Sequence, residues 1–240
     1  MDSQGSATIR TLADLLESLG GISPERVRMR PAPGTATVDD VVAADETEDR
    51  LCELIDGVLV EKARGFRESM VACTLIVLLR AHVDARKLGV VSGEAGMMRL
   101  FPDQVRIPDV AFASWARFPG RKVSQEAVPE LVPDLAVEII SQGNTPREMA
   151  RKIKEYLTAG VWLVWMVDLE ARTVTVHAPS RPPRVRSVGE TLEGGDVLPG
   201  LSFRVEDLFP TAPSPPPPSP ARRSRAARRT RPADTPPARS

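Results

Sequence analysis

The chain has 240 residues, enough for one large domain with flexible ends, and its 42% hydrophobic and 27% charged residues are typical of a globular protein. No apolar run reaches about 18 residues, which excludes a membrane-spanning helix, and two cysteines with two histidines predict neither a disulfide framework nor a zinc site. The first residues lack the apolar segment of a secretory signal, so we expect a cytoplasmic protein. The net charge of zero combines a tail of +6, residues 211–240, with a body of −6.

Three parts are predicted along the chain: an N-terminal helical arm and loop over residues 1–50, a main domain over 51–210, and the tail over 211–240. Residues 8–19 have helical apolar spacing, and the segment from Gly20 to about Arg50 has the composition of a loop. The tail consists largely of proline and arginine, cannot bury a core, and is therefore predicted to be disordered. Either a solubilising extension or a contact for nucleic acid is compatible with that composition.

The main domain opens with two short strand-like runs on either side of Asp56-Gly57, a dipeptide typical of tight hairpins. Residues 66–89 follow as a long helix that is apolar on most sides, so we expect it in the interior. Several short strands then precede a second helix, about Pro146–Ala159, and two consecutive strands follow it. This order predicts an α/β (α+β) domain with one central mixed sheet flanked by helices.

Two carboxylates occupy positions where burial is unfavourable. Glu138 lies inside the apolar run LAVEII, where an ionised carboxylate costs on the order of several kcal/mol unless a partner compensates it. Asp109 follows Pro108 at the start of another apolar run. Two acids on neighbouring strands suit Mg²⁺, which prefers oxygen ligands. The alternatives are a core carboxylate paired with one basic residue for Glu138, and a turn acid that caps the backbone for Asp109.

Four segments carry a family resemblance: ELIDGVLVE, RIPDVAF, PDLAVEII and RKIKEYLTAGVWLVWMVD. They resemble the Uma2-type proteins (the DUF820 group), which are similar to the PD-(D/E)XK restriction-endonuclease superfamily. The resemblance covers about residues 50–209 and implies a restriction-endonuclease-like fold with Asp109 in the PD element and Glu138 as the second acid. A typical member has lysine two residues after that acid, on the same face of the strand, where this chain has Ile140.

Lys152 is the candidate for the missing cation, because Lys152, Tyr156 and Gly160 match the K-x-x-x-Y-x-x-x-G pattern of Uma2-like proteins. A spacing of four places the lysine and the tyrosine on one helix face. The alternative is a solvated Glu148–Lys152 pair. Glu68, near the start of the long helix, is implied as a further metal ligand, although an acid there also suits the helix dipole.

Other polar and aromatic residues are weaker candidates. Glu53 matches the acid of the family's ELIDG motif, and we expect Gln104 and Arg106 on the surface of the sheet. Aromatic rings could stack on bases, but their strand is almost continuously apolar. We therefore expect the following rings to belong to the core: Tyr156, Trp162 and Trp165.

These expectations combine into an Mg²⁺-dependent endonuclease that acts on DNA, with Mn²⁺ as a possible substitute. Asp109, Glu138 and Glu68 would hold the ion, and Lys152 would orient or help deprotonate the attacking water. The alternative is a catalytically silent binding or scaffold protein with the same fold, which the acidic body and Ile140 favour. A homodimer is compatible with the fold, because cutting two strands suits two-fold symmetry.

Overall fold

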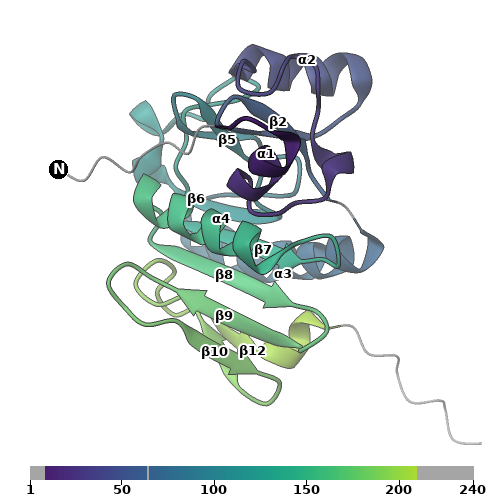
Figure 1. Cartoon of the computed structure of the whole chain (residues 1–240). Coiled ribbons are helices and arrows are strands. Elements are labelled where there is room, and N and C mark those ends of the chain that lie inside the picture. The colour runs from purple at the N-terminus through teal and green to yellow at the C-terminus, as the bar shows by residue number, and fades with distance from the viewer. Residues whose placement is uncertain (1–8, 64, 210–240) are drawn as a thin grey trace, which may run out of the picture. The chain divides into compact units, whose positions relative to one another are not determined.

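A computed structural model describes residues 9–63 and 65–209 of the chain (Figure 1). The tail lies outside the described residues, and so do the predictions of its disorder and of a nucleic-acid contact there. Within the described part of the chain, no helix is both long and apolar enough to cross a membrane.

The N-terminal arm contains α1 (Leu12–Ser18), the short 3-10 turn η1 (Pro24–Arg26) and α2 (Val38–Glu48). A capping box starts α1: Thr11 Oγ1 accepts from the Asp14 backbone N–H at 3.1 Å, and Asp14 Oδ2 accepts from the Thr11 backbone N–H at 2.9 Å. Leu15 and Leu19 bury their side chains against the first hairpin, where they contact an apolar group that includes Val58. The arm is therefore packed onto the hairpin.

Helix α2 corrects the expectation of a loop up to Arg50. It begins after Thr37, whose backbone N–H donates to Asp40 Oδ2 at 2.7 Å. Val41 and Ala44 are buried and pack against residues of the first sheet. Burial of this face stabilises a helix within a segment whose proline- and threonine-rich beginning indicated a loop.

The first sheet has four antiparallel strands in the order β2-β1-β5-β4. Its strands are β1 (Cys52–Ile55), β2 (Val58–Glu61), β4 (Met98–Phe101) and β5 (Gln104–Arg106). The hairpin predicted at Asp56-Gly57 is confirmed: both residues have positive φ, 50° and 71°, as the tight turn between β1 and β2 requires.

The second, larger sheet is mixed and has the order β10-β9-β8-β7-β6-β3. Its strands are β3 (Gly89–Ser92), β6 (Val110–Ser114), β7 (Leu135–Ile140), β8 (Leu163–Asp168), β9 (Thr173–His177) and β10 (Arg184–Ser187). Strands β7 and β8 are parallel, and the other neighbours are antiparallel. The expected α/β architecture with a mixed sheet and flanking helices is confirmed.

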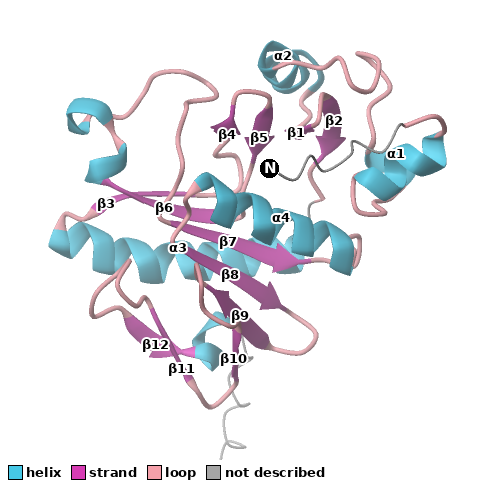
Figure 2. Cartoon of the chain, turned by 60° about the vertical axis from the view of Figure 1, so that its left-hand side comes forward, coloured by secondary structure: helices cyan, strands magenta, loops and turns pink. Residues whose placement is uncertain are grey.

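The two long helices, α3 (Phe66–Arg86) and α4 (Pro146–Ala159), cover opposite faces of the mixed sheet (Figure 2). Alternation along β7 separates the faces: Val137 packs with the α3 side, whereas Ala136 packs with the α4 side. Glu138 has the same parity as Ala136, so its side chain belongs to the α4 face.

The remaining elements are short turns and a hairpin, and the hairpin and the last turn close the end of the α3 face. They are the 3-10 turns η2 (Trp115–Arg117) and η3 (Pro119–Arg121), the hairpin of β11 (Thr191–Glu193) and β12 (Ser202–Arg204), and the turn η4 (Val205–Leu208). Leu192, Phe203 and Leu208 complete the apolar core under α3.

Two expectations about burial were wrong. Helix α3 lies on the sheet with one side open to solvent, because Val77 is 67% exposed while Leu75 and Leu79 are buried. Trp162 precedes β8 and is 59% exposed, although Trp165 is buried in the core as expected. In both cases a nearly continuous apolar run masked which side chains face the core.

Candidate active site

Helix α4 places a lysine and a tyrosine directly over Glu138. The helix starts at Pro146, where Thr145 Oγ1 accepts from the Glu148 backbone N–H at 3.0 Å, and it ends at Gly160 with φ 99°. These bounds are as predicted.

Lys152 Nζ lies 3.0 Å from Glu138 Oε2, and the Tyr156 hydroxyl donates to Glu138 Oε1 at 2.6 Å. All three side chains are buried. The predicted convergence of the strand acid and the helix lysine is therefore present.

The alternative interpretation, a solvated ion pair between Glu148 and Lys152, is wrong. Lys152 is only 4% exposed, and Glu148 pairs instead with Arg26, whose Nη2 lies 2.9 Å from Glu148 Oε1. Glu148 also accepts from Asn144 Nδ2 at 3.0 Å. Lys154, two residues further along the helix, is exposed as its position on another face predicts.

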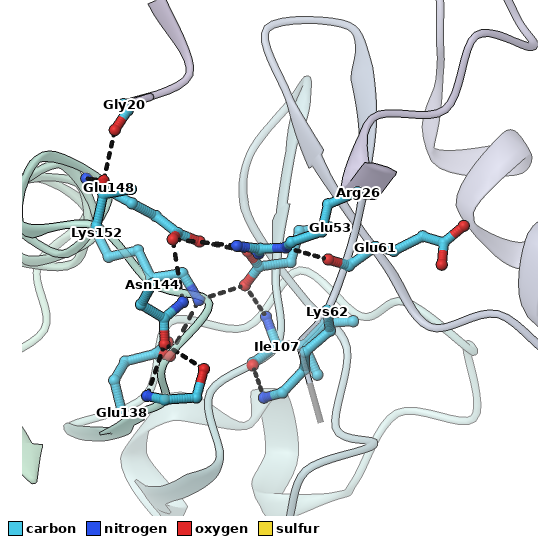
Figure 3. Close-up of polar contacts among 12 residues, drawn as sticks. Gly20, Arg26, Glu53, Glu61, Lys62, Ile107, Glu138, Asn144, Glu148 and Lys152 are labelled. Carbon is cyan, nitrogen blue, oxygen red and sulfur yellow. Dashed lines mark hydrogen bonds and ion pairs between the residues drawn. The ribbon is translucent and has the colours of Figure 1, made fainter. Parts of the chain in front are cut away.

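A second acid, Glu53, enters the site from strand β1 of the first sheet. Its Oε1 lies 3.1 Å from Lys152 Nζ, and it also accepts from the Ile107 backbone N–H at 3.2 Å. Its Oε2 pairs with Arg106 Nη1 at 2.7 Å. Figure 3 shows Lys152 lying between Glu53 and Glu138. The lysine thus bridges acids that come from two different sheets.

Arg106 corrects an expectation, since it was predicted on the surface of the sheet. Its side chain is 1% exposed and connects Glu53 to Glu155, whose Oε2 accepts from Arg106 Nε at 2.8 Å. Gln104 is likewise buried. Strand β5 lies inside the first sheet, between β1 and β4, and Arg106 extends from it to Glu155 on α4.

Asp109 lies at the start of β6, beside Glu138 on β7. Its backbone N–H donates to the Val137 carbonyl at 3.0 Å, and its Oδ2 accepts from the Ile139 backbone N–H at 2.6 Å. Its Oδ1 pairs with Lys62 Nζ at 2.8 Å. Asp109 therefore does bond to backbone, as its alternative interpretation stated, but it also carries a buried ion pair.

Six buried side chains form what we call the inner cluster: Glu53, Asp109 and Glu138 with Lys62, Arg106 and Lys152. The three acids and three bases balance in formal charge, which offsets the penalty for burying each of them. Lys62 joins the cluster from the end of β2, where its ammonium also donates to the Ile107 carbonyl (Figure 3).

The environment moves the pKa values of the inner cluster in different directions. Burial alone raises the pKa of Glu53, but the charges of Lys152 and Arg106 outweigh it and hold that pKa well below its usual range. Burial alone lowers the pKa of Lys152, but Glu138 and Glu53 outweigh it and raise that pKa. Burial raises the pKa of Glu138, Lys152 opposes this, and the charge of Asp109 adds to it. Lys152 is therefore a permanent cation at neutral pH, while Glu138 is easier to protonate than Glu53.

A cleft of about 660 Å³ is lined by residues that are close in sequence to the inner cluster, although none of the six cluster side chains lines it. Its lining includes Ala63, which follows Lys62, and Ile140, two residues after Glu138 on β7. Glu68 and Asp168 contribute carboxylates to the same cleft. A substrate in this space would therefore lie next to the ends of the strands that carry the buried acids.

The carboxylates of Asp109 and Glu138 are ligands of the kind that a hard divalent cation prefers. Each oxygen of Asp109 and Glu138 has one polar partner and keeps a further lone pair. Mg²⁺ needs only one or two protein carboxylates, because it retains several waters. Among the described residues, no three His, Cys, Asp or Glu side chains gather in a group that could hold a metal. The metal roles of these residues stay predictions.

Sequence reasoning missed Lys62 and the buried position of Arg106, and it gave Glu53 little weight. The number of buried acids indicates that buried cations must also be present, since each buried acid requires a cation as its partner. The sequence does not say which of the 32 lysines and arginines supplies that cation.

The model of the Uma2 family, described as "Putative restriction endonuclease", matches residues 38–206, so the matched region begins at α2 rather than at residue 51. The chain is similar to a solved structure described as "a putative nuclease belonging to DUF820" from Anabaena variabilis, with 21% identity and a TM-score of 0.63. That likeness covers 72% of this chain and 97% of the other, and it bears on the fold. No curated protein matches the chain.

Proposed function

The chain belongs to the Uma2 family, a family of nuclease type, and on that basis we propose that it hydrolyses phosphodiester bonds in DNA with Mg²⁺, or with Mn²⁺ in its place. The observation that carries the proposal is the pairing of Lys152 with Glu138 next to the strand start that carries Asp109, with a cleft lined by Ile140, two residues after Glu138.

Asp109 and Glu138 are the residues that would hold the ion. They lie on adjacent antiparallel strands, and Asp109 bonds to the backbone of the residue that follows Glu138. When bound, the ion would lower the pKa of a bound water and neutralise charge on the phosphodiester. Glu68 lines the cleft, and its role as a further ligand of the ion stays a prediction.

Lys152 is proposed to act as a fixed positive charge. Its raised pKa keeps the ammonium protonated, so it is poorly suited to deprotonating water. It can instead hold Glu138 in position through their 3.0 Å contact and stabilise negative charge that develops on the phosphate. Tyr156 fixes the other oxygen of Glu138 by its 2.6 Å hydrogen bond.

Hydrolysis of supercoiled plasmid with Mg²⁺ or Mn²⁺ tests the proposal. We expect nicking by the wild type, none in EDTA, and a loss of at least about a hundredfold in Asp109→Asn and in Glu138→Gln. Glu193→Gln, on an exposed position of β11, is the matched control and should cut like the wild type. Melting curves should establish that every variant is folded.

Full activity in Asp109→Asn and Glu138→Gln would assign the chemistry to other residues. Cleavage of RNA alone would leave the site in place and change the substrate. A wild type that cuts neither nucleic acid would favour the second candidate, a silent binding or scaffold protein. The balanced charge of the inner cluster and Ile140 at the usual lysine position support that candidate. The homodimer stays a prediction.

A further inference from the structure

Each of the two carboxylates proposed to hold the metal already has a lysine partner. Asp109 Oδ1 lies 2.8 Å from Lys62 Nζ, and Glu138 Oε2 lies 3.0 Å from Lys152 Nζ. Both lysine side chains are at most 5% exposed. Arg106 also pairs with Glu155, so the inner cluster together with Glu155 has four acids and three bases. A divalent ion placed among them would leave one positive charge uncompensated in a buried region. Binding of an ion is therefore linked to the departure of a cation.

The structure distinguishes the two lysines. Lys152 projects from the middle of α4 and contacts two carboxylates, Glu53 at 3.1 Å and Glu138 at 3.0 Å. Its departure would leave Glu53 with Arg106 as its closest remaining cation and would strip Glu138 of its ion pair. Lys152 is thus held from two sides and by a rigid element.

Lys62 is held less firmly. Among the described residues its direct polar contacts are one carboxylate, that of Asp109, and the uncharged carbonyl of Ile107, while its charge acts on Glu53 and Glu138 without a direct contact. It follows the last residue of β2, and Ala63 after it lines the cleft of about 660 Å³. A lysine ammonium on a flexible four-carbon stem can turn from such a position toward solvent.

We propose that Lys62 is the displaceable cation of the site: it occupies Asp109 in the free protein and moves into the cleft when a divalent ion binds. This inference rests on the proposed function. In the cleft, the Lys62 ammonium can pair with a phosphate of the substrate. It would thereby replace the lysine that typical members have on the strand, at the position where this chain has Ile140. Lys62 therefore lowers the affinity for the ion while supplying positive charge to the substrate.

Calorimetric titration with Mn²⁺ in the absence of DNA tests the exchange. We expect Lys62→Met to bind Mn²⁺ at least about tenfold more tightly than the wild type, because in the wild type the ion must first break the Lys62–Asp109 ion pair, and the attraction of two unit charges about 4 Å apart is substantial even at the dielectric constant of water. Lys62→Arg should bind more weakly than the wild type, since a guanidinium can grip the Asp109 carboxylate through two donors. Lys154→Met, an exposed position on α4, is the control and should bind like the wild type.

Equal or weaker Mn²⁺ binding by Lys62→Met would overturn the exchange, and so would tighter binding by Lys62→Arg. The plasmid assay on the same proteins separates this outcome from failure of the nuclease proposal. If the wild type cuts DNA while the affinities are equal, the exchange is wrong and the nuclease stands. If Lys62→Met binds more tightly but the wild type cuts no nucleic acid, the exchange stands without the nuclease. Folded Lys62→Met that binds no Mn²⁺ would contradict both.

Discussion

Replacement of Lys152 by methionine isolates the electrostatic support of the inner cluster. Methionine keeps most of the side-chain length but removes the charge that lies within 3.1 Å of both Glu53 and Glu138. Removing one partner of a buried ion pair destabilises a protein by about 3–5 kcal/mol. With a urea m-value of about 2 kcal/mol/M, the midpoint of unfolding should fall by about 2 M.

The loss should depend on pH with a defined sign. In Lys152→Met the pKa of Glu138, already raised by burial, rises further because its cation is gone. A carboxyl group whose pKa is raised in the folded state contributes stability at low pH and loses it as the pH rises through the folded-state pKa. The difference between wild type and Lys152→Met should therefore be larger at pH 7.5 than at pH 5.

Urea unfolding followed by circular dichroism at the two pH values measures this difference, with Lys154→Met as the control on the same helix. The exposed control should lose less than about 0.5 kcal/mol. A Lys152→Met protein as stable as the control, or a difference that is the same at both pH values, would refute the reasoning that Lys152 neutralises two buried acids.

Two further predictions concern packing and thiol chemistry. Gly20→Ala should destabilise the protein by at least about 2 kcal/mol, because φ is +94° and a Cβ would lie 2.8 Å from the Glu148 backbone. Gly21→Ala, with φ +72° and open space, should lose only about 1 kcal/mol, and equal losses in urea unfolding would contradict the close approach. At pH 8, DTNB should modify exposed Cys73 in the native protein but not Cys52, because burial raises the pKa of Cys52 to about 11. Two equally fast thiols would contradict that difference.

Local chemistry explains which parts of the fold could be predicted from the sequence. Helix α4 and the first hairpin have signals within a few residues of their ends, namely Pro146, Gly160 and Asp56-Gly57. Helix α2 was missed although Thr37 and Asp40 form a capping pattern, because the composition around them is that of a loop. A capping pattern therefore predicts the start of a helix only when it is given more weight than the loop-like composition of the surrounding segment.

The candidate site could be predicted only in part. Glu138 and Asp109 are visible because a carboxylate within an apolar run requires compensation, and Lys152 is visible through its motif. Lys62 is separated by 47 positions in the sequence from its partner Asp109, and Arg106 is separated by 53 positions from its partner Glu53. Nothing near either base in the sequence therefore identifies its partner. Their roles depend on how the first sheet packs against the mixed sheet and α4.

The most direct test of the metal site is diffraction at the manganese absorption edge from crystals soaked in MnCl₂. The account predicts one anomalous peak within about 2.2 Å of carboxylate oxygens of both Asp109 and Glu138. It also predicts that Lys62 no longer contacts Asp109 in those crystals. A well-occupied peak away from these two carboxylates, or soaked crystals without any peak, would contradict the proposed metal-dependent nuclease.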